Sequence, residues 1–206
     1  MSNDAIVFIV DDDEAVRQST AWLIESIGLK VTTSTCADEF LENYNNEPGC
    51  IVMDVRMPGM SGLEAQEEMK NRGISLPLIF ITGHGDVPMA VRALKRGAFD
   101  FIEKPFNDQL LLDAVQRGLK NNSEAMESLI ENESIDKRIA SLTPREHEVM
   151  MRVTEGKPNK VIAHELNVSI KTVEVHRARM MEKMEASSVA QLVKTTIQAR
   201  KSNIND

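Results

Sequence analysis

Four apolar, strand-like runs within the first 105 residues each end in a charged or hydroxyl-bearing side chain. The runs occupy residues 5–10, 50–53, 76–81 and 99–103, and the residues that follow them are Asp11–Asp13, Asp54, Thr82 and Lys104. Because the carboxyl ends of parallel strands meet at one edge of an open sheet, these side chains are expected to lie together. The sequence therefore predicts an edge that holds several carboxylates, one hydroxyl and one ammonium.

Amphipathic stretches of helical period alternate with these runs through residues 5–120. A weaker strand and helix, Leu29–Thr33 and Ala37–Tyr44, complete five strand-then-helix repeats. Such alternation favours a parallel sheet with helices on both faces. We therefore expect an α/β doubly wound domain with a five-stranded parallel sheet of the flavodoxin type, over residues 4–120.

The pattern changes after residue 120. Residues 121–137 are polar and acidic, with Met126, Leu129 and Ile130 at helical spacing. They predict either an extension of the preceding helix or a helical linker with a loose segment near Ser134–Lys137. Residues 138–206 show helical periodicity alone, so they predict a separate all-α domain of about four helices.

The charge of the chain also changes along its length. The total is −8, yet residues 138–206 carry 12 Lys and Arg against 8 Asp and Glu, a balance of +4. A basic second part joined to an acidic first part is expected if only the second part approaches a polyanion.

Targeting and redox signals are few. No apolar run approaches the ~20 residues that a membrane helix requires, and the N-terminus lacks the basic and apolar regions of a secretory signal. Cys36 and Cys50 have no metal-binding spacing and are expected to be reduced thiols. We therefore expect a cytoplasmic protein with no membrane partner.

The predicted sheet edge suits a magnesium-dependent phosphoryl acceptor. Crowded carboxylates raise one another's pKa unless a cation joins them, and Mg²⁺ is the oxygen-binding ion that suits a phosphate site. Asp54, on the central strand, would be the nucleophile. Lys104 would contact a phosphoryl oxygen as a point charge, and Thr82 would donate its hydroxyl. Pro105 makes the bond that precedes it a candidate cis peptide.

The ordered combination of DDD, MDVRMPGMSG, TG and KP resembles the CheY-like receiver domains of two-component response regulators, over residues 4–120. The resemblance implies that a sensor histidine kinase phosphorylates Asp54. It implies that Mg²⁺ is bound by the carboxylates of Asp11, Asp12 and Asp54 and by the backbone carbonyl of Arg56. Thr82 and Phe101 resemble the switch pair of the family, with Phe101 standing where many relatives carry tyrosine. Asp13 is interpreted as a helix-start residue.

The segment TGHGDVPMAVRALKRGAFDFIEKPF, residues 82–106, is similar to regulators of the FixJ type. This resemblance implies that the fourth helix and fifth strand form a face that changes on phosphorylation and mediates homodimer formation. The candidate residues on that face are Val91, Arg92, Lys95 and Phe101.

The basic part of the chain has clear helix signals. Thr143 followed by Pro144 and Glu146 predicts a helix start with a capping box. A short helix at Asn159–Leu166, a turn at 167–169 and a helix at Ile170–Glu185 follow, and then a fourth helix at Val189–Lys201. The short helix, tight turn and third helix favour a helix-turn-helix over an ordinary bundle whose charged face is merely solvated.

At 100° per residue the third helix has an apolar side, which predicts a core of Val173, Met180 and Met184. LTPRE, EGKPNKVIAHEL and SIKTVEVHR resemble the LuxR-type output domain over about Ser141–Lys201. The resemblance implies that the third helix enters the major groove of promoter DNA. It assigns phosphate or register contacts to Lys160, Lys171 and Thr172. Residues that face or flank the bases are Glu174, Val175, Arg177 and Ala178.

Glu174 departs from relatives that carry lysine at this position. A carboxylate in the groove can accept a hydrogen bond from cytosine N4, but it also repels phosphate. Alternatively, Glu174 would pair with Arg177 or Arg179, and the sequence does not decide between the two arrangements.

These features favour a response regulator that controls transcription through phosphorylation of Asp54, with activation the commoner outcome and RNA polymerase a further candidate partner. It would not be an enzyme beyond its own phosphorylation. One alternative is a magnesium phosphohydrolase, which is disfavoured because Arg56 stands where such enzymes carry a second carboxylate. The other is a constitutive DNA-binding regulator with a vestigial receiver, which the full acceptor set disfavours.

Overall fold

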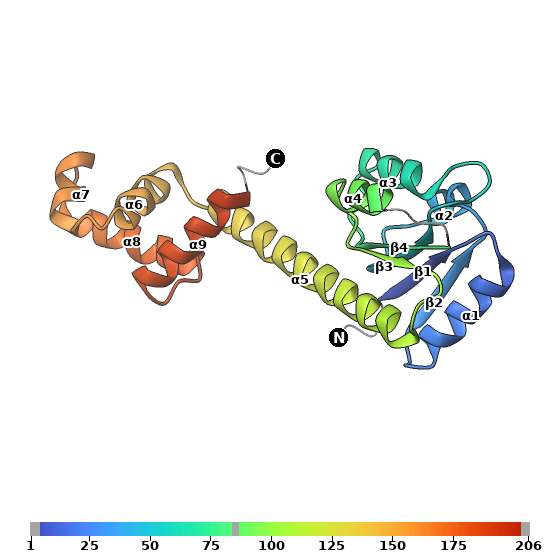
Figure 1. Ribbon diagram of the computed structural model, residues 1–206. Helices are drawn as coiled ribbons and strands as arrows, with labels where there is room; N and C mark the ends of the chain where they lie inside the picture. The colour runs from blue at the N-terminus through green and yellow to red at the C-terminus, as the bar shows by residue number, and fades with distance from the viewer. Residues whose placement is uncertain (1–4, 84–86, 203–206) are drawn as a thin grey trace. The chain divides into compact units, whose positions relative to one another are not determined.

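The protein is described by a computed structural model that covers residues 5–83 and 87–202, with side chains to Ala199. The chain divides into two compact units, Met1–Met126 and Glu127–Asp206, which are described separately. Figure 1 shows the helices and strands of both units.

The first unit is built on a five-stranded parallel sheet in the order β2-β1-β3-β4-β5. The predicted α/β doubly wound fold is therefore confirmed. Its strands are β1 (Ile6–Val10), β2 (Lys30–Ser34), β3 (Gly49–Asp54), β4 (Leu78–Thr82) and β5 (Asp100–Glu103). The central strand β3 is buried along its whole length, as expected of a strand covered on both faces.

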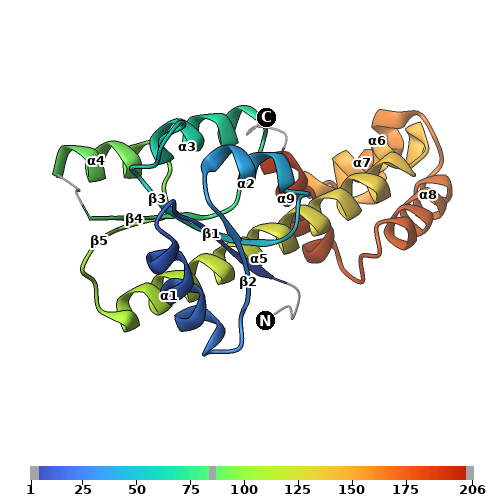
Figure 2. The ribbon, with the colours of Figure 1, turned by 90° about the vertical axis from the view of Figure 1, so that its right-hand side faces the viewer.

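Helices cover both faces of this sheet. They are α1 (Glu14–Glu25), α2 (Ala37–Asn43), α3 (Gly62–Asn71), α4 (Val87–Lys95) and α5 (Asp108–Ala140). Side chains alternate across each strand, so Phe8 and Val10 pack in one core with α2, α3 and α4. Val7 and Ile9 pack in a second core with α1 and α5. The two layers are visible on opposite sides of the sheet in Figure 2.

Helix α5 agrees with the first of the two expectations for residues 121–137, an extension of the preceding helix. It runs for 33 residues without interruption, so Ser134–Lys137 is helical and the loose segment is not found. Residues 121–137 are therefore part of α5 rather than a separate element. Asn122 is buried, and its side-chain oxygen accepts a hydrogen bond from Gly49 N at 3.0 Å, which ties α5 to the start of β3.

The second unit contains the end of α5 and four further helices, in agreement with the expected all-α domain. These are α6 (Pro144–Thr154), α7 (Asn159–Leu166), α8 (Ile170–Lys183) and α9 (Val189–Ser202). The predicted capping box is present, because Thr143 and Glu146 exchange backbone-to-side-chain hydrogen bonds at the start of α6. The three predicted core residues of α8 and its C-cap are all buried, namely Val173, Met180 and Met184.

Both cysteines are free thiols. Within the described residues, no helix combines the length and apolar character needed to cross a membrane.

Candidate functional site

The carboxyl edge of the sheet brings several of the predicted site residues together. Asp11 follows β1, Asp54 ends β3, and Thr82 ends β4. Lys104 Nζ lies 2.8 Å from Asp11 Oδ2 and 3.7 Å from Asp54 Oδ1. Asp11 and Thr82 are buried, and Asp54 is only 7% exposed. The local cause is topological: β1 and β3 are paired in the sheet, and so are β3 and β4.

Asp54 lies in surroundings that disfavour its charged form. Burial raises the pKa of this carboxyl, and the neighbouring Asp11 carboxylate adds to the rise. The Lys104 ammonium and the backbone N–H groups of Val55 and Arg56 oppose it without cancelling it. Asp54 Oδ1 is buried and has no hydrogen-bond partner among the described residues. An acceptor oxygen left in this state is costly, and a cation or a new covalent bond would relieve the cost.

The residues present suit a divalent cation with oxygen ligands. Asp54 Oδ1 accepts no hydrogen bond from the described residues, and the Asp11 carboxylate shares the Lys104 ammonium with it. Within the described chain, however, no three carboxylate, imidazole or thiol side chains are close enough to hold a metal ion together. The expected set of magnesium ligands is therefore only partly assembled. Asp11 and Asp54 lie beside Lys104, whereas the Asp12 side chain is exposed.

Two residues in or near the acidic run Asp11–Asp13 make hydrogen bonds that stabilise the local fold. Asp13 caps α1, since its Oδ1 accepts hydrogen bonds from Ala15 N at 2.9 Å and Val16 N at 3.2 Å, as predicted for a helix-start residue. Arg17 was not predicted: its Nη1 donates to the backbone carbonyl of Asp11 at 2.7 Å. Helical periodicity places Arg17 on α1 but does not reveal that partner. The Lys104–Pro105 bond is cis, as predicted.

The proposed switch residues lie on adjacent strands. Thr82 ends β4, and β4 pairs with β5 so that Phe80 is opposite Phe101. The two rings have centroids 6.3 Å apart, and Phe101 is partly buried. Because residues two apart in a strand share a face, Thr82 and Phe80 project to the same side as Phe101.

Helix α4 presents most of its apolar side chains to solvent. Ala93 is its one fully buried residue within Val87–Lys95, and Val87 is 78% exposed. The candidate residues Val91, Arg92 and Lys95 are all exposed on this helix. An amphipathic helix with an uncovered apolar stripe is a candidate contact surface.

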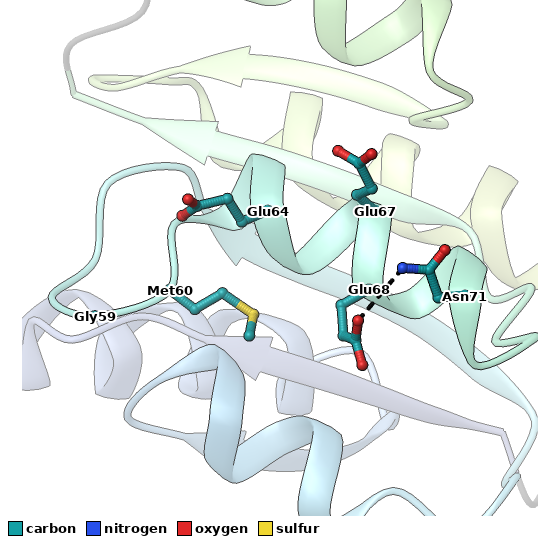
Figure 3. Close-up of a pocket in the computed structure, with 6 residues that line it drawn as sticks. All are labelled: Gly59, Met60, Glu64, Glu67, Glu68 and Asn71. Carbon is teal, nitrogen blue, oxygen red and sulfur yellow. Dashed lines mark hydrogen bonds between the residues drawn. The ribbon is translucent and has the colours of Figure 1, made fainter.

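A surface hollow of about 420 Å³ lies beside α3 and does not include Asp54. Its lining is shown in Figure 3 and comprises Gly59, Met60, Glu64, Glu67, Glu68 and Asn71. The carboxylates of this hollow already have partners: Glu64 accepts from Ser61, Glu67 from Arg96 and Glu68 from Arg72. The carboxylates that line the hollow therefore serve in helix capping and in surface ion pairs.

The second unit contains the predicted helix-turn-helix. Helix α7 ends at Leu166, and its C-cap Asn167 adopts a left-handed conformation with φ 54°, a region that asparagine tolerates better than most residues. Ser169 then caps α8, because its hydroxyl accepts a hydrogen bond from Thr172 N at 3.0 Å. The exposed residues along α7 and α8 include most of the predicted DNA contacts, namely Lys160, Lys171, Glu174, Val175 and Ala178.

Two of the predicted contact residues have intramolecular partners. The Thr172 hydroxyl lies 2.8 Å from the Ser169 hydroxyl. Arg177 is half-buried, and its Nη1 donates to Asn159 Oδ1 at 2.8 Å. Thus the partner found for Arg177 is an amide on α7 rather than the Glu174 carboxylate considered from the sequence.

Comparison with protein families supports both halves of this description. Residues 7–116 match the response regulator receiver domain, and residues 140–196 match the luxR family of bacterial regulatory proteins.

Full-length relatives are similar to nearly the whole chain. The transcriptional regulatory protein FixJ of Azorhizobium caulinodans is 47% identical over 194 residues, covering 94% of this chain and 92% of that protein. The response regulator protein TodT of Pseudomonas putida is 42% identical, with 93% and 85% covered. Among solved structures, the response regulator StyR is 43% identical with a TM-score of 0.86, covering 95% of this chain and 99% of that one. Full-length FixJ from B. japonicum is 40% identical with a TM-score of 0.59, covering 96% and 98%.

Proposed function

Because this chain belongs to the two-component response regulators that join a receiver domain to a LuxR-type DNA-binding domain, and so controls transcription, we propose that Asp54 is the phosphoryl acceptor through which it is regulated. The single observation that carries the proposal is the environment of the Asp54 carboxylate. This carboxylate ends the central strand, and its buried Oδ1 has no hydrogen bond among the described residues and lies 3.7 Å from the Lys104 ammonium.

The proposed reaction is a phosphoryl transfer to this carboxylate. An Asp54 oxygen attacks the phosphorus of a phosphohistidine on a sensor histidine kinase, and a P–O bond forms as the P–N bond breaks. The electron pair of the broken bond stays on the imidazole, which takes up a proton from solvent. Lys104, now bound to Asp11, would contact an oxygen of the transferred group and offset its negative charge.

Magnesium would be held by the backbone carbonyl of Arg56 together with Asp11, Asp12 and Asp54. When bound, it would supply positive charge opposite the phosphoryl oxygens. Asp12 is exposed, so its side chain would turn toward the site to complete the set.

Switching would follow from the two strands beside Asp54. We propose that the Thr82 hydroxyl turns toward the phosphoryl group and that Phe101 moves inward with it. The exposed face of α4 and β5, with Val91, Arg92 and Lys95, would then form the homodimer. Phosphorylation can raise DNA affinity only to the extent that it prefers the DNA-competent arrangement.

The output domain would bind promoter DNA through α7 and α8. Lys160, Lys171 and Thr172 would contact phosphates or fix the register, while Glu174, Val175 and Ala178 would face the bases. The exposure of nearly all of these side chains supports this assignment. Promoter binding would place the protein in the cytoplasm and bring it near RNA polymerase, with activation as the expected outcome.

The proposal is tested by comparing the wild-type chain with Asp54→Asn, each with and without acetyl phosphate and Mg²⁺. Mass spectrometry should find a labile phosphoryl adduct on Asp54 in the wild type and none in the variant. DNA affinity should rise with phosphodonor in the wild type alone. Asp38→Asn, which neutralises an exposed carboxylate of α2, is the matched control and should behave as wild type.

Two results would favour the alternative functions. Equal DNA affinity in all four conditions would indicate a constitutive regulator with a vestigial receiver. Continuous turnover of a generic phosphate ester, lost in Asp54→Asn, would indicate a phosphohydrolase.

A further inference from the structure

We propose that Arg177 is a positioning residue for DNA binding: it fixes the angle between α7 and α8 through Asn159, and it does not read bases. The inference rests on the proposed DNA-binding function of the second unit. It revises the sequence-based assignment, in which Arg177 flanks the bases.

The geometry of Arg177 directs it away from the exposed face of α8. Arg177 is four residues after Val173 and three before Met180, and both of these are fully buried. Residues at these spacings share a side of a helix. The Arg177 side chain therefore leaves α8 next to the core, where its Nη1 donates to Asn159 Oδ1 at 2.8 Å.

The partner residue lies at a sensitive place in the motif. Asn159 is the first residue of α7, and the N-cap before it is Pro158, which provides no side-chain cap. The Arg177–Asn159 contact joins residues 18 apart in sequence and links the start of α7 to the middle of α8. Hydrogen bonds with a charged donor are stronger than neutral ones, so this one is well suited to hold two short helices in register.

A second side-chain contact fixes the far end of α8. Lys183 Nζ donates to Glu146 Oε2 at 2.7 Å and to the backbone carbonyl of Ser141 at 3.0 Å. Glu146 is buried at the start of α6, so the end of α8 is held against α6. The contact between Arg177 and Asn159 adds a polar link between α7 and α8 to the buried core that Ile162 and Val173 share.

This link connects the two kinds of DNA contact. Lys160, proposed to bind phosphate, directly follows Asn159, and the proposed base-facing residues Val175 and Ala178 are neighbours of Arg177. Loss of the link would let the phosphate contact and the base-facing surface shift relative to one another. Binding to a preferred sequence would suffer because base contacts need that register, whereas binding to arbitrary DNA would suffer little.

The test uses the full-length chain treated with acetyl phosphate and Mg²⁺. The two probes are a duplex selected by the wild type from a random-sequence pool and an unselected duplex of equal length. Affinities are measured at several salt concentrations for Arg177→Met, Asn159→Ala, the double variant and Arg177→Lys. Arg179→Met, which removes the same charge from an exposed position two residues away, is the control.

Both single variants should weaken binding to the selected duplex about 10-fold, the equivalent of one good hydrogen bond, and Asn159→Ala should leave the unselected duplex unaffected. The double variant should be no worse than Arg177→Met, since both substitutions remove the same contact. The salt dependence of Asn159→Ala should match wild type because no DNA-contacting charge is removed. Arg177→Lys should recover most of the affinity, because one N–H donor suffices to reach Asn159.

Three results would overturn the inference. The first is wild-type selectivity in Asn159→Ala together with lost selectivity in Arg177→Met, which would make Arg177 a base-reading residue. The second is additive losses in the double variant. The third is an equal loss in Arg177→Met and Arg179→Met, which would reflect charge alone. Failure of the wild type to enrich any sequence would instead count against the proposed DNA-binding function itself.

Discussion

Asp54 and Glu146 are both carboxylates with little exposure, and their surroundings shift their pKa values in opposite directions. Burial raises the pKa of Asp54. The Lys183 ammonium, with help from the Thr143 backbone N–H, lowers the pKa of Glu146 to about 2. The first environment disfavours the charged carboxylate and leaves one oxygen without a hydrogen bond among the described residues, whereas the second uses the charge to hold α6 and α8 together.

Glu146→Gln is expected to make the stability of the second unit less dependent on acid. The folded pKa of Glu146 is depressed from about 4.5 to about 2, so the ionised carboxylate stabilises the fold above the unfolded value. That contribution is lost as the pH falls from about 4.5 toward 2. Denaturant titrations of the full chain, followed by NMR of α6 and α8 amides, should show Glu146→Gln less stable than wild type at pH 7.

The difference in unfolding free energy between wild type and Glu146→Gln should decrease steadily as the pH falls from about 4.5 toward 2. Glu148→Gln is the control, because Glu148 pairs with Arg145 on the surface of the same helix and such pairs contribute little. A gap that is constant with pH would show that the ionisation of Glu146 is not what stabilises α6 against α8.

The elements themselves follow closely from sequence periodicity, whereas the contacts between them do not. Helix α7 was expected at Asn159–Leu166 and is found there, because strong turn residues bound it. Periodicity also separated the core of α8 from its exposed face. Periodicity predicts on which side of its helix a residue lies, but not which residue of another helix it contacts. The contact between Arg177 and Asn159 was therefore not predicted. The length of α5 was left open between an extended helix and a linker, because a polar, acidic segment without glycine fits both; the structure shows the extended helix.

The same reasoning explains what could be predicted of the acceptor site. Four side chains were expected to lie together because each ends or follows a parallel strand, namely Asp11, Asp54, Thr82 and Lys104. The carboxyl ends of parallel strands lie at one edge of the sheet, so the sequence pattern was enough to place them there. The exposed position of Asp12 was not foreseen, since adjacent residues in a loop have no periodic constraint.

At the scale of elements, Gln66 connects α3 to α4. Its Nε2 donates to the Ala93 carbonyl at 3.1 Å, while its buried Oε1 accepts no hydrogen bond from the part of the chain that the structure describes. Gln66→Leu should change the unfolding free energy of the first unit by less than about 1 kcal/mol, because it removes an unsatisfied acceptor along with one donor. The Ala93 carbonyl keeps its hydrogen bonds from Arg96 N and Ala98 N.

Gln66→Ala is the matched variant and should destabilise the unit by about 1–3 kcal/mol, because packing is lost as well. Urea unfolding of the full chain, followed by hydrogen exchange of α3 and α4, would measure both. A loss in Gln66→Leu as large as that in Gln66→Ala would mean that the hydrogen bond, rather than packing, holds α4.

At the scale of the whole molecule, the charges of the chain are divided unevenly. Residues 138–206 carry a balance of +4 within a total of −8, so the first part of the chain repels DNA while the second attracts it. The proposed phosphorylation would replace one negative charge on Asp54 with roughly two. Through charge alone it would therefore weaken DNA binding, and any gain must come from rearrangement.

The gain in affinity on phosphorylation should consequently increase with salt. Added salt screens the unfavourable charge but leaves the preference for the DNA-competent arrangement. The measurement is the ratio of the affinities of phosphorylated and unphosphorylated chain for the selected duplex, between low and physiological ionic strength. A ratio that falls as salt rises would indicate that the gain is itself electrostatic.

Asp54 Oδ1 is buried without a hydrogen bond among the described residues, which costs folding stability. In a lineage that had lost its kinase, selection would act on stability alone and would favour an uncharged residue at position 54. An aspartate at position 54 is therefore what the proposed phosphoryl transfer requires, and what selection for stability alone would not favour.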